Sequence, residues 1–260
     1  SIVCSNPCLR SMPITGSTSE IENTEDLAVQ QEQWLQAEAL CDAMAAIHQR
    51  GWCDGTGGNF SVVVNRSPLR LLMAPSGVDK GSVRPGQLLL VDGAGSVLRG
   101  EGRSSAETLL HLAIVEVCGA GAVLHTHSQA GTLLSAWLDP AHGNASGARE
   151  GTGGGVSHLE ISDLEMLKGL EGVTSHEALV KVPVLSNDQD IRGLSERARP
   201  HLIAAPHGLL IAGHGLYAWG RDLAQARRHL EIHEFLLEQQ WRRLLLAGLK
   251  PSRPSGGAQA

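Results

Sequence analysis

The chain has 260 residues, enough for one large domain or at most two, and 42% of them are hydrophobic. Its 21 Lys and Arg residues are outnumbered by 27 Asp and Glu, so the formal charge is −6, which argues against nucleic acid as the main partner. The five cysteines are scattered and odd in number, as is typical of reduced thiols. No apolar run reaches the length of a membrane span and no secretory leader is visible, so we expect a cytoplasmic protein with no membrane partner.

The N-terminal segment, residues 1–25, is rich in Ser, Thr, Pro and Asn and is predicted to be a flexible tail. Residues 27–50 favour a helix that stops at Gly51. We expect a single folded domain over residues 26–248 and a second tail over residues 249–260.

Two loops in the first half of this domain have the composition of anion-binding turns. Residues 54–61, DGTGGNFS, precede an apolar strand at 62–64, and a second strand at 71–74 runs into Pro75-Ser76-Gly77. Glycines expose backbone N–H groups and let an anion approach closely, although a plain flexible turn is the common alternative. A third strand at 88–91 ends in the turn Asp92-Gly93, which favours antiparallel pairing.

The most informative segment is an apolar run, residues 122–124, that ends in His125-Thr126-His127. Alternate residues of a strand point to one face, so His125 and His127 project together. His214 follows a second apolar run, residues 209–211, and is the best candidate for a third ligand. Three neutral imidazoles leave a position open on a divalent ion, which is the pattern of catalytic metal sites. The alternative is a pair of strand histidines that hydrogen-bond to their neighbours.

Such an ion would act as a Lewis acid on a substrate oxygen, and zinc is favoured over iron, cobalt or nickel. A carboxylate is then needed to move a proton. Glu107 follows Ser104 by three residues and Glu165 follows Ser162 by three, so each glutamate also fits a helix capping box.

The second half of the chain is predicted to alternate between strands and helices. We expect a short helix opened by the capping box of Ser162 and Glu165 and running through residue 170, strands at 180–185, 209–211 and 216–219, a helix at 191–199, and a long helix capped by Asp222. On that last helix, His229 and His233 are expected at a solvated face or a subunit contact, and residues 143–155 are expected to form a Gly-rich surface loop. The mixture predicts an α/β fold with three α/β/α layers around a mixed, largely antiparallel sheet.

With these motifs assembled, the sequence resembles the class II aldolase and adducin family. The resemblance extends from about residue 35 to residue 246. It rests on the segments at residues 57–61, 125–127 and 213–220. The stretches at 159–169 and 187–191 are typical of the dehydratase branch of that family.

The resemblance implies a class II aldolase-like catalytic domain with one Zn²⁺ per subunit, held by His125, His127 and His214. It implies Glu165 as the catalytic acid or base, whereas Glu107 has that place in the aldolase branch. The phosphate of a small sugar substrate would be surrounded by Gly57, Gly58, Asn59, Ser76 and Gly77.

The activity that the resemblance implies is dehydration of 5-methylthioribulose 1-phosphate in methionine salvage, carried out by a homo-oligomer, expected to be a tetramer. A zinc-dependent aldolase that cleaves a sugar phosphate is the first alternative. A non-catalytic, adducin-like interaction domain is the second.

Overall fold

The computed structural model describes residues 18–141 and 155–248 and divides the chain into two compact units, residues 1–35 and 36–260. Most of the predicted N-terminal tail, nearly all of the predicted Gly-rich loop and the predicted C-terminal tail lie outside the described residues. The boundaries expected for the catalytic domain therefore stay a prediction. No helix within the described ranges combines the length and the apolar character that a bilayer crossing requires.

The second unit is built on one sheet of nine strands within the described residues, in the order β4-β3-β2-β1-β5-β9-β8-β7-β6. The strands are β1 (Asn59–Arg66), β2 (Leu69–Met73), β3 (Leu89–Asp92), β4 (Val97–Arg99), β5 (Ala122–Thr126), β6 (Val156–Ile161), β7 (Val180–Leu185), β8 (Gly208–Ile211) and β9 (Gly215–Gly220). Each neighbouring pair is antiparallel except β7 and β8, which are parallel. The prediction of a mixed, largely antiparallel sheet is confirmed.

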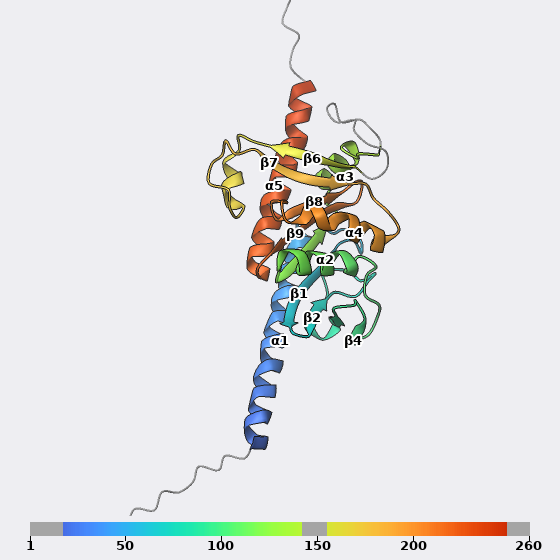
Figure 1. Ribbon diagram of the computed structural model, residues 1–260, viewed down its shortest axis with the longest axis vertical. Helices are drawn as coiled ribbons and strands as arrows, with labels where there is room; N and C mark the ends of the chain where they lie inside the picture. The colour runs from blue at the N-terminus through green and yellow to red at the C-terminus, as the bar shows by residue number, and fades with distance from the viewer. Residues whose placement is uncertain (1–17, 142–154, 249–260) are drawn as a thin grey trace, which may run out of the picture. The chain divides into compact units, whose positions relative to one another are not determined.

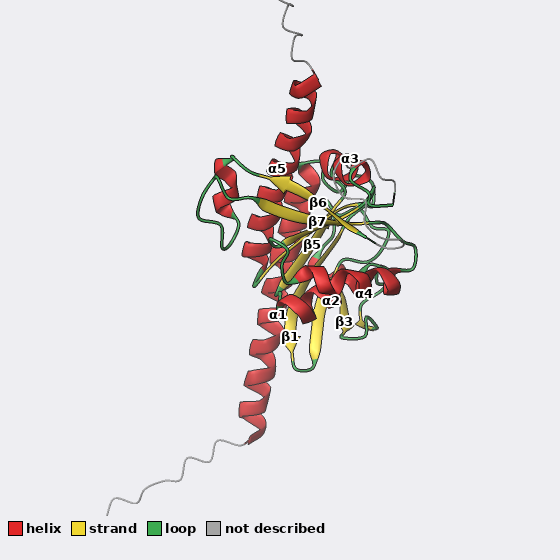
Figure 2. Cartoon of the chain, turned by 45° about the horizontal axis from the view of Figure 1, so that its top comes forward, coloured by secondary structure: helices red, strands yellow, loops and turns green. Residues whose placement is uncertain are grey.

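Helices cover both faces of this sheet, so the predicted α/β/α layering is also confirmed (Figures 1 and 2). The helices are α1 (Thr18–Gln49), α2 (Thr108–Cys118), α3 (Gln129–Trp137), α4 (Ile191–Leu202) and α5 (Leu223–Gly248), with short 3₁₀ turns η1 (Pro85–Gln87) and η2 (Glu165–Gly169). Val123 and Leu124 belong to different core clusters because side chains alternate along β5. Val123 packs with α2 and α4, whereas Leu124 packs with residues 36–49 of α1 and with α3 and α5.

Most predicted elements are present, with informative differences at their limits. Helix α1 begins at Thr18, nine residues before the predicted start at residue 27. Strand β4 and helix α3 were not predicted, nor was β6, where only alternate side chains are buried. Helix α5 begins after Asp222 as predicted, and the carboxylate of Asp222 accepts a hydrogen bond from the Gln225 N–H at 2.7 Å.

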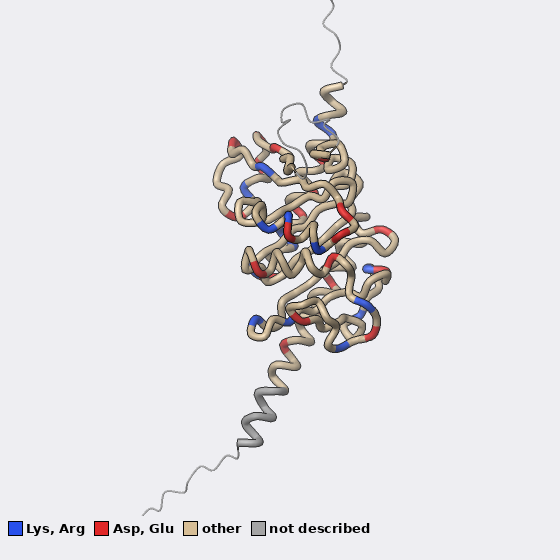
Figure 3. The backbone as a smooth tube through the Cα atoms, turned by 45° about the vertical axis from the view of Figure 1, so that its right-hand side comes forward, with Lys and Arg blue, Asp and Glu red and all other residues tan. Residues whose placement is uncertain are grey.

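The described cysteines agree with the sequence-based expectation of reduced thiols. Cys41, Cys53 and Cys118 are free thiols, while Cys4 and Cys8 lie outside the described residues. Lys and Arg are interspersed with Asp and Glu along the described backbone (Figure 3).

Candidate metal centre

Strand β5 lies between β1 and β9, and its C-terminal end carries the histidine motif. His125 pairs with Asn59 of β1 and with Tyr217 of β9. Directly paired residues face the same side of a sheet, so these three side chains lie together on the face covered by α2. The ring of His125 is fully buried and stacks on Tyr217 with ring centroids 3.9 Å apart. Packing therefore holds the imidazole in one orientation.

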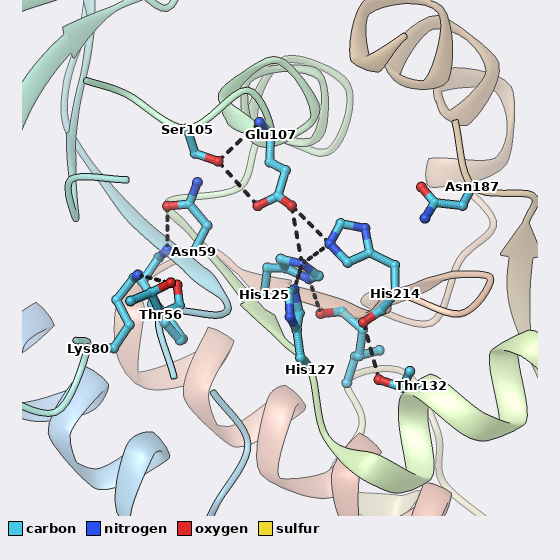
Figure 4. A network of polar contacts seen from close by, with 12 residues as sticks. Thr56, Asn59, Lys80, Ser105, Glu107, His125, His127, Thr132, Asn187 and His214 are labelled. Atoms are coloured by element: carbon cyan, nitrogen blue, oxygen red, sulfur yellow. Dashed lines mark hydrogen bonds and ion pairs between the residues drawn. The ribbon is translucent and has the colours of Figure 1, made fainter. Parts of the chain in front are cut away.

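Four side chains converge at this end of β5: Glu107, His125, His127 and His214 (Figure 4). One possible ligand atom from each lies within 4.8 Å of the others. The Nε2 atom of His125 is 2.8 Å from Nε2 of His127 and 3.3 Å from Nε2 of His214. Oε1 of Glu107 is 2.9 Å from Nε2 of His214. The structure thus brings together the three predicted histidine ligands and Glu107, the glutamate expected to act in the aldolase branch.

The chemistry of His125 suits a metal ligand. Its Nδ1 is 2.9 Å from the Leu216 carbonyl oxygen, a contact that only an N–H can satisfy, so Nε2 carries the lone pair that faces the other two rings. Burial lowers the pKa of His125 and of His127, which keeps both imidazoles neutral and able to ligate. Two nitrogens on one tetrahedral zinc lie about 3.4 Å apart, close to the separations observed. The donor set therefore fits a divalent ion.

Glu107 does not form the capping box that its spacing suggests, because it is itself the N-cap residue of α2 and its side chain makes no cap bond. Ser104 donates instead to the Gly95 carbonyl, and the Ser105 hydroxyl donates to Oε2 of Glu107 at 3.3 Å. Burial raises the pKa of Glu107, but the hydrogen bond with His214 and the nearby histidines outweigh this and lower it to about 2. An ionised carboxylate thus lies beside the three histidines.

Glu165 does not join this group in the single chain. It is the first residue of η2, its side chain is 72% exposed, and its carboxylate contacts Lys168 and His176. The predicted capping box is absent here too, since the Ser162 hydroxyl donates to Oδ2 of Asp163 at 2.6 Å. An acid–base role for Glu165 stays a prediction.

The predicted phosphate loop packs directly against the histidines. A Cβ atom on Gly57 would lie 2.9 Å from Nδ1 of His127. Gly58 has φ +77°, and a Cβ atom there would lie 2.7 Å from the carbonyl oxygen of His125. Only glycine lets the loop approach this closely, so an anion held by the loop would be close to the metal centre.

Asn59 has a hydrogen-bonding group that the fold leaves free. Its Oδ1 accepts a hydrogen bond from the Phe60 N–H at 2.9 Å, while its buried Nδ2 has no partner among the described residues. Unpaired buried donors are rare, so this amide suits an anionic ligand. Ser76 and Gly77 follow β2 as predicted, and the Ser76 N–H donates to the Arg103 carbonyl at 2.9 Å.

Lys80 is a candidate residue that the sequence analysis missed. Its side chain is 2% exposed, and Nζ donates to the carbonyl oxygen of Thr56 at 3.0 Å (Figure 4). It also donates to the carbonyl oxygen of Val78 at 2.9 Å. Within the described ranges it forms no ion pair with a carboxylate. It therefore places a positive charge beneath the Gly-rich loop. A lysine three residues after Gly77 shows no pattern that would separate it from an exposed turn residue.

The expectation that His229 and His233 lie at a solvated face is wrong. Each ring is 1% exposed. Nδ1 of His229 lies 2.7 Å from the Trp219 carbonyl oxygen, and Nε2 of His233 lies 2.8 Å from that of Pro206. The exposed Arg228 lies beside them in sequence on the outer face of α5, whereas these two histidines are buried on its inner face.

His229 also groups with His207 and Glu171 as a possible metal-binding set. The rings of His207 and His229 are stacked with centroids 4.3 Å apart. The carboxylate of Glu171 accepts a hydrogen bond from Gln225 at 2.7 Å and lies 3.6 Å from Arg221. Stacking and these polar contacts account for the cluster without an ion.

Comparison with known proteins supports this reading of the fold. The class II aldolase and adducin N-terminal domain family matches residues 38–241. A curated relative from Pseudoalteromonas translucida, named methylthioribulose-1-phosphate dehydratase, is 39% identical over 82% of this chain and 93% of its own length. A relative of the same name from Serratia proteamaculans is 40% identical over 81% of this chain and 96% of its own length.

Solved structures share the fold at lower identity. The Escherichia coli protein YgbL superposes with a TM-score of 0.65 and 23% identity, covering 85% of this chain and 93% of its own. An L-fuculose-1-phosphate aldolase from Thermus thermophilus gives a TM-score of 0.62 and 22% identity, covering 84% and 98%. From the match over most of its length, this chain belongs to the class II aldolase and adducin family.

Proposed function

We propose that this chain catalyses the metal-dependent dehydration of 5-methylthioribulose 1-phosphate to 2,3-diketo-5-methylthiopentyl 1-phosphate in methionine salvage. The observation that carries the proposal is the convergence of Glu107, His125, His127 and His214 in a chain 39–40% identical to curated dehydratases. The solved aldolases support the fold alone, because their identity is much lower.

The metal of the proposed reaction is a divalent ion, zinc by preference, with one ion per chain held by His125, His127 and His214. When bound there, it supplies Lewis-acid polarisation of a substrate oxygen. The Leu216 carbonyl fixes the tautomer of His125, and Tyr217 fixes its ring plane. The chain thus presents its ligand atoms with little reorganisation.

The proposed reaction requires removal of the C3 proton and protonation of the departing C4 hydroxyl. Our proposal from the family resemblance is that Glu165 performs these transfers. Because Glu165 is exposed and lies outside the histidine group in the single chain, its role requires that a neighbouring subunit or a moved segment bring it to the substrate. Glu107, already at the histidines, is the second candidate.

The phosphate of the substrate is proposed to lie against Gly57, Gly58, Asn59, Ser76 and Gly77. Gly57 and Gly58 contact the two strand histidines, and the free amide of Asn59 supplies a donor. The ammonium of Lys80 adds positive charge beneath the loop. Anchoring the phosphate in this way would hold the reacting carbons near the metal centre.

An aldolase that cleaves a sugar phosphate is a second candidate, favoured by one observation. The carboxylate at the histidines is Glu107, the position that the aldolase branch uses. The names of the relatives, at much higher identity than the solved aldolases, favour dehydration.

The decisive experiment combines metal analysis of the purified protein with product analysis on 5-methylthioribulose 1-phosphate. We expect about one zinc per chain and a diketone product. Glu165→Gln should keep the metal and lower turnover by at least ~100-fold. Glu160→Gln, which removes another exposed and lysine-paired glutamate, is the matched control and should be fully active.

The outcomes separate the candidates. Full activity of Glu165→Gln together with an inactive Glu107→Gln would move the acid–base role to Glu107. Formation of dihydroxyacetone phosphate or a short aldehyde, without water loss, would support the aldolase. We also propose a homotetramer in the cytoplasm, which sedimentation and fractionation would test.

A further inference from the structure

Thr126 lies between the two strand histidines, and its side chain points to the opposite face of the sheet, toward α5. There its hydroxyl donates to Oε1 of Glu234 at 2.5 Å. Both side chains are buried, with Thr126 fully covered and Glu234 1% exposed. The carboxyl group of Glu234 therefore lies directly behind the segment that carries His125 and His127.

The same carboxyl group also lies near Ser128, the residue after His127. Ser128 lies close enough to this carboxyl group to lower its pKa, and the Ser128 Oγ accepts the Gly131 N–H at 3.0 Å as the N-cap of α3. Glu234 thus bonds to the residue before His127 and lies near the residue after it. This link joins the middle of α5 to the end of β5.

Burying the Glu234 carboxyl group carries a desolvation cost. Burial raises the pKa of Glu234 to about 7, and its Oε2 has no hydrogen-bond partner among the described residues. Its neighbours on the inner face of α5, Leu230 and Leu237, are apolar and fully packed. An apolar residue at 234 would fill this position with less desolvation. Packing alone therefore does not explain a glutamate here.

We propose that Glu234 is a positioning residue for the metal centre, which it serves by fixing the chain at Thr126 so that His125 and His127, on either side of it, keep their ligand geometry. Groups that orient metal ligands from behind affect affinity strongly, although they never touch the ion. The inference rests on the proposed metal site, and it does not depend on the substrate or on the reaction.

The test measures metal affinity separately from stability. Thr126→Val keeps the shape of the side chain and removes the hydroxyl, and Glu234→Ala removes the carboxyl group. Each should weaken Zn²⁺ binding by ~10–100-fold in competition with a chelator and should alter the visible spectrum of the Co²⁺-loaded protein. The double variant should bind Zn²⁺ no less tightly than the weaker-binding single variant, because both changes break the same hydrogen bond.

Two further variants sharpen the result. Glu234→Gln keeps an oxygen acceptor for Thr126 and should retain most of the affinity. Glu238→Ala removes the glutamate one turn later on α5, which pairs with Arg242 at the surface, and should leave affinity unchanged. Urea unfolding of every variant measures any loss of stability separately from metal affinity.

The outcomes are distinguishable. If Thr126→Val and Glu234→Ala lower stability but leave Zn²⁺ affinity and the Co²⁺ spectrum unchanged, the positioning role is overturned and Glu234 is only structural. If the unaltered protein itself binds no Zn²⁺ or Co²⁺, the metal centre fails, and the positioning role fails with it. Should Glu234→Ala not fold, Thr126→Val decides the question alone.

Discussion

Oε1 of Glu107 lies 2.9 Å from Nε2 of His214, and this contact joins the first turn of α2 to the turn between β8 and β9. Both side chains are 18% exposed, so the contact is largely shielded yet remains open to a small ligand. The carboxylate also lies 3.9 Å from Nε2 of His125. It can therefore act either as a fourth ligand or as a base beside three histidines.

Substitution of Gly57 by alanine should damage the metal centre. The new Cβ atom would lie 2.9 Å from Nδ1 of His127 and 3.2 Å from the carbonyl oxygen of Asp54, so the ring or the loop must move. We expect at least ~10-fold weaker metal binding and a comparable loss of kcat/KM. Gly86→Ala, at a position where a Cβ meets nothing within 4 Å, is the control. A Gly57→Ala protein with normal affinity would show that the loop does not constrain His127.

Replacement of Lys80 by methionine should act mainly on binding of the phosphate group. Methionine keeps the length of the side chain but removes the positive charge beneath the Gly-rich loop and the two bonds to Thr56 and Val78. We expect KM for the sugar phosphate to rise by ~10-fold, about 1.4 kcal/mol, with a smaller effect on kcat. Inhibition by inorganic phosphate should weaken in parallel. Lys181→Met, which changes an exposed lysine, is the control. Equal effects of the two substitutions on KM would contradict a role for Lys80 in phosphate binding.

The stability of the fold should fall on acidification through His233. Burial lowers the pKa of His233 from 6.5 to about 4, so between these values the unfolded chain binds more protons than the folded one. The contribution is fully present above pH 6.5 and is lost as the pH falls toward about 4, by up to ~3 kcal/mol.

His233→Gln keeps a donor for the Pro206 carbonyl but cannot titrate. Urea unfolding at pH 7, 5.5 and 4.5 should show the native protein losing stability relative to this variant. The other histidines titrate in both proteins and cancel in the comparison. A difference in unfolding free energy that stays constant with pH would contradict the assignment.

The sequence alone was sufficient for the features that depend on local periodicity. The alternation of side chains along a strand puts His125 and His127 on one face, whatever the rest of the chain does. Asp222 caps the start of α5 because its carboxylate accepts a hydrogen bond from a free backbone N–H group. This interaction also depends only on neighbouring residues in the sequence. The glycines at 57 and 58 likewise signal a close backbone approach, and the structure shows that they meet the histidines.

Only the tertiary structure decided which distant side chains meet these local features. Glu107 and Glu165 have the same capping-box spacing, yet only Glu107 lies at the histidines, because α2 packs over β5 while η2 lies apart. His229 and His233 are predicted at a solvated face or subunit contact from the charged residues around them, but the inner face of α5 buries both. Lys80 is a further example, since its ammonium group is buried only when the loops that carry Thr56 and Val78 fold together around it. Spacing reports the geometry within one element, whereas contacts between elements follow from how the whole core packs.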